Sequence, residues 1–208
     1  GSNIVNIGLV LALGYLVAPG FGSSAGSRPH LLINTCLMLG ATLAFALLSL
    51  RGFFDPPAGI VFLVLFAAVI YLMYRSGDGP DPPSDAHTGS PILLTSAGLA
   101  MLFPGAHLLL SAAVELAAIL AVPPAVIGLS MVAAGTALPE LATTIVAAVK
   151  KSHGVAVGTI LGSNVFNLLF IIGINALVFP IPAGDLRDTL VMIGFTLAIF
   201  PLFIRNNR

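Results

Sequence analysis

Long apolar stretches dominate this chain and decide what it can fold into. Hydrophobic residues make up 58% of it and charged residues 8%, with a mean hydropathy of +1.08, whereas soluble domains carry about 25% charged residues. A helix that spans a bilayer needs about 20 apolar residues. Lipid offers the backbone no partners, and no barrel-like alternation is present, so the stretches are predicted to be helices. We expect an all-α integral membrane protein with about seven transmembrane helices, at 3–18, 31–50, 59–74, 92–122, 125–149, 155–179 and 186–204.

Residues 76–90 interrupt the apolar pattern. They are rich in Gly, Pro and Asp, which predicts a hydrophilic linker between two membrane halves, 1–75 and 91–208. If the segment after the first helix is cytoplasmic, six of the eight Lys and Arg residues lie on the cytoplasmic side, as the positive-inside rule requires. We therefore expect a protein of a bacterial-type inner membrane with linker 76–90 in the cytoplasm. The six are Arg28, Arg75, Lys150, Lys151, Arg205 and Arg208, and the other two are Arg51 and Arg187.

Two short sequences occur twice in the same order. GSNIVN (1–6) returns as GSNVFN (162–167), and MLGATLA (38–44) returns as MIGFTLA (192–198). The first pair lies on the first and sixth predicted helices, an odd number of crossings apart, so the two repeats are inverted. Such repeats are typical of secondary transporters that bind substrate near the bilayer midplane. We expect a ten-helix fold of two inverted five-helix repeats: three helices of the first in 1–75, four of the second in 91–208, and the missing helices in further parts of the same protein.

An acidic residue, Glu140, lies near the centre of a predicted span in the sequence GTALPE (135–140). Gly135 and Pro139 weaken the helix around it, and the missing donor of Pro139 frees a carbonyl. Such a break is tolerated where it faces protein or a water-lined cavity. Carboxylate, hydroxyl and carbonyl oxygens are hard ligands, suited to Na⁺ or Ca²⁺ rather than to soft metals. The alternative is a kinked packing helix with a structural Glu140.

A second group of polar residues follows in the next predicted span. Ser163 and Asn167 are four residues apart and share a helix face, with Thr159 one turn earlier. These side chains could offer oxygens to one ion. Alternatively, Ser163, Asn164 and Asn167 bond neighbouring helices, with a Gly-x-x-x-Gly pair allowing close approach. The two roles are compatible.

Several classes of function are excluded by what the sequence lacks. It has no nucleotide-binding loop, no metal-binding histidine pair and no nucleophile elbow, so we expect no enzyme and no cofactor. Its net charge is zero, and no basic groove invites nucleic acid. The expected partner is the lipid bilayer, and transport would be driven by an ion gradient.

Residues 126–173 carry GTALPE and GSNVFN in order. They resemble the second signature repeat of the sodium/calcium exchangers of the calcium/cation antiporter superfamily, Gly-Thr-Ser-x-Pro-Glu followed by Gly-Ser-Asn-x-Phe-Asn, and GSNIVN looks like the end of the first. The resemblance implies transported Na⁺ and Ca²⁺ as ligands, with Glu140 central to both. It further implies oxygens from Thr136, Ser163, Asn167 and the Ala133 carbonyl, and from Ser2 and Asn6 of the first repeat.

Two positions depart from the family pattern. Ala137 stands where the family usually has Ser, and Asn167 is neutral where some members carry Asp, so Na⁺ coupling is the open point. The resemblance implies a secondary-active antiporter that exchanges Na⁺ for Ca²⁺ by alternating access at an oxygen-lined midplane site. The alternatives are a cation/H⁺ exchanger with Glu140 as proton carrier and a non-transporting membrane interaction protein. Because Ca²⁺ usually takes more than one carboxylate, we expect a second Glu from a missing helix, and no transport by this chain alone.

Overall fold

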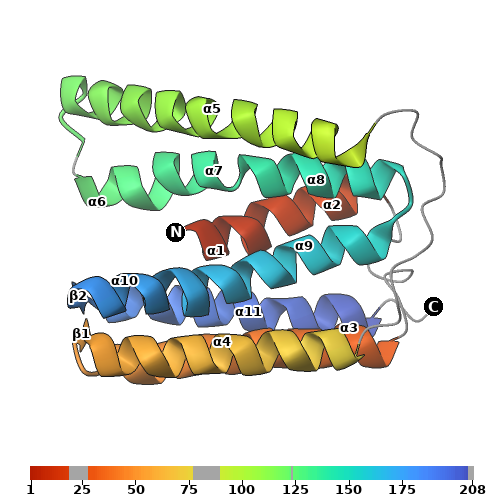
Figure 1. Cartoon of the computed structure of the whole chain (residues 1–208), viewed down its shortest axis with the longest axis horizontal. Coiled ribbons are helices and arrows are strands. Elements are labelled where there is room, and N and C mark those ends of the chain that lie inside the picture. Colours follow the sequence, from red (N-terminus) through yellow and green to blue (C-terminus); the bar gives the residue numbers. More distant parts are fainter. Residues whose placement is uncertain (19–27, 77–89, 123, 206–208) are drawn as a thin grey trace. The chain divides into compact units, whose positions relative to one another are not determined.

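A computed structural model describes residues 1–18, 28–76, 90–122 and 124–205 (Figure 1). Helices form at all seven apolar stretches, which confirms a mostly helical membrane protein. Within the described ranges, three helices are long and apolar enough to cross a bilayer: His30–Ser49, Pro56–Ser76 and His153–Val178. The number rises to four if the helices on either side of Ala137 form one span. The count of seven spans stays a prediction, and linker residues 77–89 lie outside the described residues.

The chain divides into two compact units. Unit 1 comprises residues 1–2 and 79–139, and unit 2 comprises residues 3–78 and 140–208. This division follows packing, so it leaves the boundaries 1–75, 76–90 and 91–208 untested.

Unit 1 is a long helix packed against a shorter, interrupted one. The long helix α5 (Pro91–Ile119) contacts α6 (Pro124–Ile127), the π-helical turn η2 (Gly128–Val132) and α7 (Ala133–Thr136). Gly135 sits where any Cβ would overlap the side chain of Leu109. A larger residue there would require the Leu109 side chain to move, so Gly135 lets α7 and α5 pack with this leucine between them.

Unit 2 contains the repeated sequences apart from Gly1 and Ser2. GSNIVN begins a helical stretch of α1 (Ser2–Val5), the π-helical turn η1 (Asn6–Leu11) and α2 (Ala12–Val17). GSNVFN lies in a longer one of α9 (His153–Val165), the π-helical turn η3 (Phe166–Ile171) and α10 (Ile172–Val178). The other helices are α3 (Arg28–Ser49), α4 (Pro56–Ser76), α8 (Leu138–Val149), which belongs to this unit from Glu140 on, and α11 (Leu186–Arg205).

A small β-ribbon joins two loops of unit 2. Strand β1 (Phe53–Phe54) pairs antiparallel with β2 (Ile181–Pro182). Helix α3 ends at this ribbon and α11 begins there, so these two packed helices, which carry the MLGATLA and MIGFTLA copies, run in opposite directions (Figure 1). Because the two strands pair, both loops lie at the same end of unit 2. This is required if successive predicted helices cross the membrane in alternating directions. Which side faces the cytoplasm stays a prediction.

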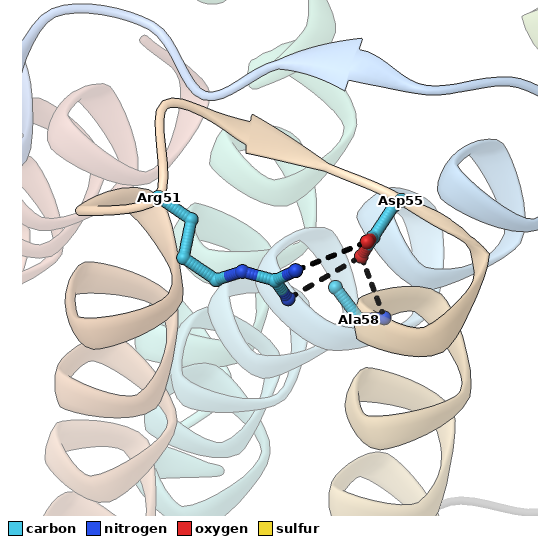
Figure 2. A network of polar contacts seen from close by, with 3 residues as sticks. All are labelled: Arg51, Asp55 and Ala58. Atoms are coloured by element: carbon cyan, nitrogen blue, oxygen red, sulfur yellow. Dashed lines mark hydrogen bonds and ion pairs between the residues drawn. The ribbon is translucent and has the colours of Figure 1, made fainter.

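The turn between α3 and α4 is held by one carboxylate. Figure 2 shows Asp55 accepting hydrogen bonds from the guanidinium of Arg51, at 3.1 and 3.4 Å, and from the backbone N–H of Ala58 at 3.2 Å. Asp55 thus caps the first turn of α4. Pro56 follows at the first helical position, where its missing N–H costs nothing.

Helices α4 and α10 pack at a glycine contact. A Cβ on Gly59 would lie 2.8 Å from the carbonyl oxygen of Gly173, and a Cβ on Gly173 would lie 3.2 Å from the carbonyl oxygen of Gly59. Small residues let membrane helices approach this closely. This contact fixes α10, and with it the adjoining turn η3, against α4.

Candidate functional site

Five polar residues from the two hexapeptide copies meet in a network that we call the amide cluster: Asn3, Asn6, Ser163, Asn164 and Asn167. The side-chain nitrogen of Asn6 donates to Ser163 Oγ at 3.0 Å and to Asn164 Oδ1 at 3.2 Å. Asn3 donates to the backbone carbonyl of Asn164 at 3.0 Å and accepts from the side-chain nitrogen of Asn167 at 3.1 Å. The interhelical bonding expected of these residues is therefore present.

The bonds of the amide cluster are exchanged between the two copies. Asn3 and Asn164 occupy the same place in their hexapeptides, 161 residues apart, as do Asn6 and Asn167. Asn6 donates to Asn164 Oδ1, and Asn167 donates to Asn3 Oδ1. In both cases the asparagine at the sixth position of one hexapeptide donates to the asparagine at the third position of the other. The two helical stretches run in opposite directions (Figure 1), which gives the cluster an approximate twofold symmetry.

Asn6 is the member of the cluster with an unused acceptor. Its side chain is 0% exposed, and its Oδ1 has no hydrogen-bond partner in the described structure. A buried acceptor without a partner costs about 1–3 kcal/mol. Most buried polar groups are satisfied, so such an atom calls for an explanation. A cation or water on Asn6 Oδ1 would supply the missing partner.

Both copies change helix type at this point. The π-helical turn η1 begins at Asn6 itself, and η3 begins at Phe166, one residue before Asn167. Single π-helical turns inside α-helices are rare overall, and those that do occur are often found at functional sites. They mark the segment where each hexapeptide departs from regular helix.

Glu140 lies in unit 2, half-buried, in the first turn of α8. The predicted helix break is confirmed: α7 ends at Thr136, Ala137 forms a turn, and α8 starts at Leu138. Pro139 occupies the first turn of α8, where the helix needs no donor. The partial positive charge of a helix N-terminus favours a carboxylate there.

Three predicted ligands, Ala133, Thr136 and Ser2, belong to unit 1. The Thr136 hydroxyl donates to the carbonyl of Ala133 at 3.1 Å, and the N–H of Ala137 donates to the same oxygen at 3.2 Å. Thr136 also lines a mostly apolar hollow of about 170 Å³ in this unit, together with His107 and Leu109. Ligand roles for these residues stay predictions of the resemblance.

The structure adds two residues that the sequence did not single out as site residues. Asn3 is 6% exposed and Met38, on α3, is 0% exposed; Asn3 bonds Asn167, and the Met38 sulfur accepts from Asn164 Nδ2 at 3.6 Å. The signal for Asn3 was present, since both hexapeptides have Asn at the third position. Thr159 instead bonds within its own helix, to the carbonyl of Val155 at 2.9 Å.

The donor set is one of hard oxygens. Across the described ranges, no group of three or more His, Cys, Asp or Glu side chains lies together. Unit 2 brings together an amide, a hydroxyl and the unused acceptor of Asn6, and it also carries the carboxylate of Glu140. Oxygens of these kinds suit Na⁺ and Ca²⁺.

Comparison with known proteins gives consistent matches. The sequence profile of the sodium/calcium exchanger protein family matches residues 90–208. The chain is 32% identical over 227 residues to CaxA of Alkalimonas amylolytica, a candidate antiporter, covering 100% of this chain and 69% of that protein. It is 36% identical over 117 residues to the sodium/calcium exchanger MaX1 of Methanosarcina acetivorans, covering 55% of this chain and 33% of that one.

A solved structure matches almost the whole chain. The sodium-calcium exchanger NCX_Mj, soaked with Na⁺ and Sr²⁺, superposes with a TM-score of 0.75 at 26% identity, covering 98% of this chain and 66% of that one. This chain therefore spans about two thirds of the length of CaxA and NCX_Mj.

Proposed function

The chain belongs to the sodium/calcium exchanger protein family, and on that premise we propose that it is a secondary-active antiporter exchanging Na⁺ for Ca²⁺. Membership supports a cation antiporter of the membrane rather than an enzyme. The ions and the mechanism are the proposal. Ligands from unit 2 are Glu140, Ser163, Asn167 and Asn6.

The unused oxygen of Asn6 carries this proposal. The amide is fully buried, its nitrogen already makes two hydrogen bonds, and its Oδ1 has no partner in the described structure. Leaving this atom unpaired lowers stability, and a bound cation would remove that cost. An oxygen kept available at the most polar point of a membrane helix pair is what a cation site requires.

Competition for the same oxygens gives exchange. The negative charge of Glu140 is costly in a membrane without a cation, so the site is best occupied by either Ca²⁺ or Na⁺. An occupied, neutralised site changes its accessibility from one side of the membrane to the other at a lower free-energy cost than an empty, charged one. A gradient of one ion therefore drives the other in the opposite direction.

Uptake of ⁴⁵Ca²⁺ into liposomes containing the full-length protein tests this function. An outward Na⁺ gradient should drive uptake, and Glu140→Gln should abolish it. The exposed Glu115 on α5 gives a matched control, since Glu115→Gln should keep most of the uptake. Failure of the wild-type protein to bind or transport either ion would refute the proposal.

A cation/H⁺ exchanger is the second candidate, and one observation favours it. Ala137, at the break beside Glu140, is 1% exposed and offers no hydroxyl where the family usually has Ser. Fewer oxygens weaken a Na⁺ site more than a proton site, because a proton needs only the Glu140 carboxylate. Uptake driven by a pH gradient and not by a Na⁺ gradient would replace Na⁺ coupling by H⁺ coupling.

A further inference from the structure

We propose that Met38, Asn164 and Asn3 are positioning residues that hold the amides of Asn6 and Asn167 with their nitrogens toward the cluster and their oxygens away from it. This inference rests on the proposed function, because it explains how the site presents oxygens rather than N–H groups to a cation. A carboxamide has one donor end and one acceptor end of nearly equal size. Its orientation is decided by its hydrogen-bond partners alone.

The orientation of Asn6 is set at Met38. A thioether sulfur can accept a hydrogen bond but has no proton to donate, so the Asn164 side chain must turn its nitrogen toward Met38 Sδ, 3.6 Å away. Asn164 Oδ1 then faces Asn6, and Asn6 must turn its own nitrogen toward Asn164, at 3.2 Å. The oxygen of Asn6 is thereby left over, as observed.

Ser163 fits the same orientation. Its hydroxyl donates to the carbonyl oxygen of Ile160 at 3.2 Å, and Ser163 Oγ accepts from the side-chain nitrogen of Asn6 at 3.0 Å. A hydroxyl can rotate to donate instead, so the orientation of Asn6 is decided at Asn164. If Asn6 were flipped, its oxygen would face the acceptor Asn164 Oδ1 and its N–H groups would face outward, which repels a cation.

Asn167 is oriented by a parallel route. Asn3 turns its nitrogen to the backbone carbonyl of Asn164, which is also an acceptor only, at 3.0 Å. Asn3 Oδ1 then faces Asn167, whose nitrogen donates to it at 3.1 Å. Each route thus starts at a group without a proton, a thioether or a carbonyl, and ends with an amide whose oxygen points away from the cluster.

The repeat provides a matched control for Met38. Met192 is the corresponding residue of the second MxGxTLA copy and is also buried, at 8% exposed. The backbone carbonyls of both methionines accept a threonine hydroxyl at 2.9 Å, but among the described residues the sulfur of Met192 accepts no hydrogen bond. Met38→Leu and Met192→Leu therefore make the same mild change of shape, and only the first removes an amide partner.

The first measurement is NMR of the full-length protein labelled with ¹⁵N-asparagine in detergent, which reads the amides directly. Met38→Leu should shift the side-chain NH₂ signals of Asn164 and Asn6, while Met192→Leu should leave both in place. The signal of Asn175, which bonds only its own helix through Ile171, should be constant in both variants. Equal responses to the two methionine variants would overturn the proposal.

The second measurement is equilibrium binding of ⁴⁵Ca²⁺. Met38→Leu should lower the Ca²⁺ affinity about three- to ten-fold, which is the effect of one disturbed hydrogen bond. Met192→Leu should lower it less than about two-fold. A wild-type protein that binds neither Ca²⁺ nor Na⁺ would refute the proposed function instead, and the NMR comparison would still decide the orientation of the amides.

Discussion

Two sets of buried polar residues in unit 2 are satisfied in different ways. Three threonines of α3 and α11 bond the backbone carbonyl four residues earlier in their own helix: Thr35 at 2.7 Å, Thr42 at 2.9 Å and Thr196 at 2.9 Å. The amide cluster instead bonds across helices, between residues 157 to 164 positions apart. Only the second set leaves a buried oxygen over, that of Asn6.

The difference separates burial from function. A hydroxyl that back-bonds within its helix needs nothing from its surroundings and is compatible with any packing. A carboxamide has its donors and its acceptor at separate ends, so a network of carboxamides has a definite orientation and can leave one end without a partner. A buried threonine that bonds its own helix therefore says little about ligands, whereas an incomplete amide network points to one.

The largest effect on Ca²⁺ affinity is expected from Glu140, whose carboxylate belongs neither to the threonines nor to the amide cluster. Glu140→Gln should lower Ca²⁺ affinity about 100-fold or more, since removing one partner of a buried charge pair costs about 3–5 kcal/mol and each 1.4 kcal/mol is about tenfold. Equilibrium binding of ⁴⁵Ca²⁺ to the full-length protein measures it. Glu115→Gln should change the affinity less than about two-fold. Equal affinities for the Glu140 variant and the wild type would place the cation elsewhere.

A direct contrast of the two sets pairs Asn6→Ala with Thr42→Val. Asn6→Ala should lower the free energy of unfolding by about 1–3 kcal/mol, because it leaves the acceptors of Ser163 and Asn164 without their hydrogen-bond donor. It should also lower the Ca²⁺ affinity about tenfold. Thr42→Val removes one self-satisfied hydroxyl and should cost about 1 kcal/mol with no change in Ca²⁺ affinity. Thermal unfolding in detergent and ⁴⁵Ca²⁺ binding give the two values. A loss of affinity in Thr42→Val would erase the distinction.

The glycine contact tests whether general loosening mimics a site defect. Gly59→Ala should destabilise by about 1–3 kcal/mol, because the added Cβ would lie 2.8 Å from the Gly173 carbonyl oxygen, yet should leave Ca²⁺ affinity near the wild-type value. Gly194→Ala meets no atom within 4 Å and should stabilise α11 by up to about 1 kcal/mol. Both are read by thermal unfolding. A large fall in affinity for Gly59→Ala would show that binding follows overall packing and not the amides.

The smallest effect is expected at the α3–α4 turn, where the polar contacts are exposed. Arg51→Gln should cost no more than about 0.5 kcal/mol, the usual value of a surface ion pair. Asp55→Ala removes the helix cap as well and should cost about 1 kcal/mol. Thermal unfolding at low and high salt separates the two, since added salt screens only the ion pair. Neither variant should alter Ca²⁺ binding.

The helices were predictable because lipid constrains them locally. Every apolar stretch became a helix near its expected bounds, for example 186–204 against Leu186–Arg205, and the break beside Glu140 follows from Gly135 and Pro139. The positions of these residues in one stretch of chain were enough. The site was predictable in part: Ser163, Asn167 and Asn6 were expected, and unit 2 brings them into one network.

Other features depend on contacts between distant parts of the chain. The β1–β2 ribbon involves residues with no strand pattern, and the close approach of Gly59 to Gly173 is invisible in either helix alone. Asn3 and Met38 were not expected near the site, since a spacing of residues gives the face of a helix and not its neighbour. The partner of an amide decides its orientation, and that partner is here on another helix.

Composition and local spacing alone thus determined a helical membrane protein, the broken helix at Glu140 and the two copies of a polar motif, because bilayer thickness and backbone hydrogen bonding act on short stretches of chain. The tertiary structure decided which ends of the asparagines bond to one another and which oxygen, that of Asn6, is left without a partner. A carboxamide has no preferred orientation of its own, and only the acceptors at Met38 and the Asn164 carbonyl supply one.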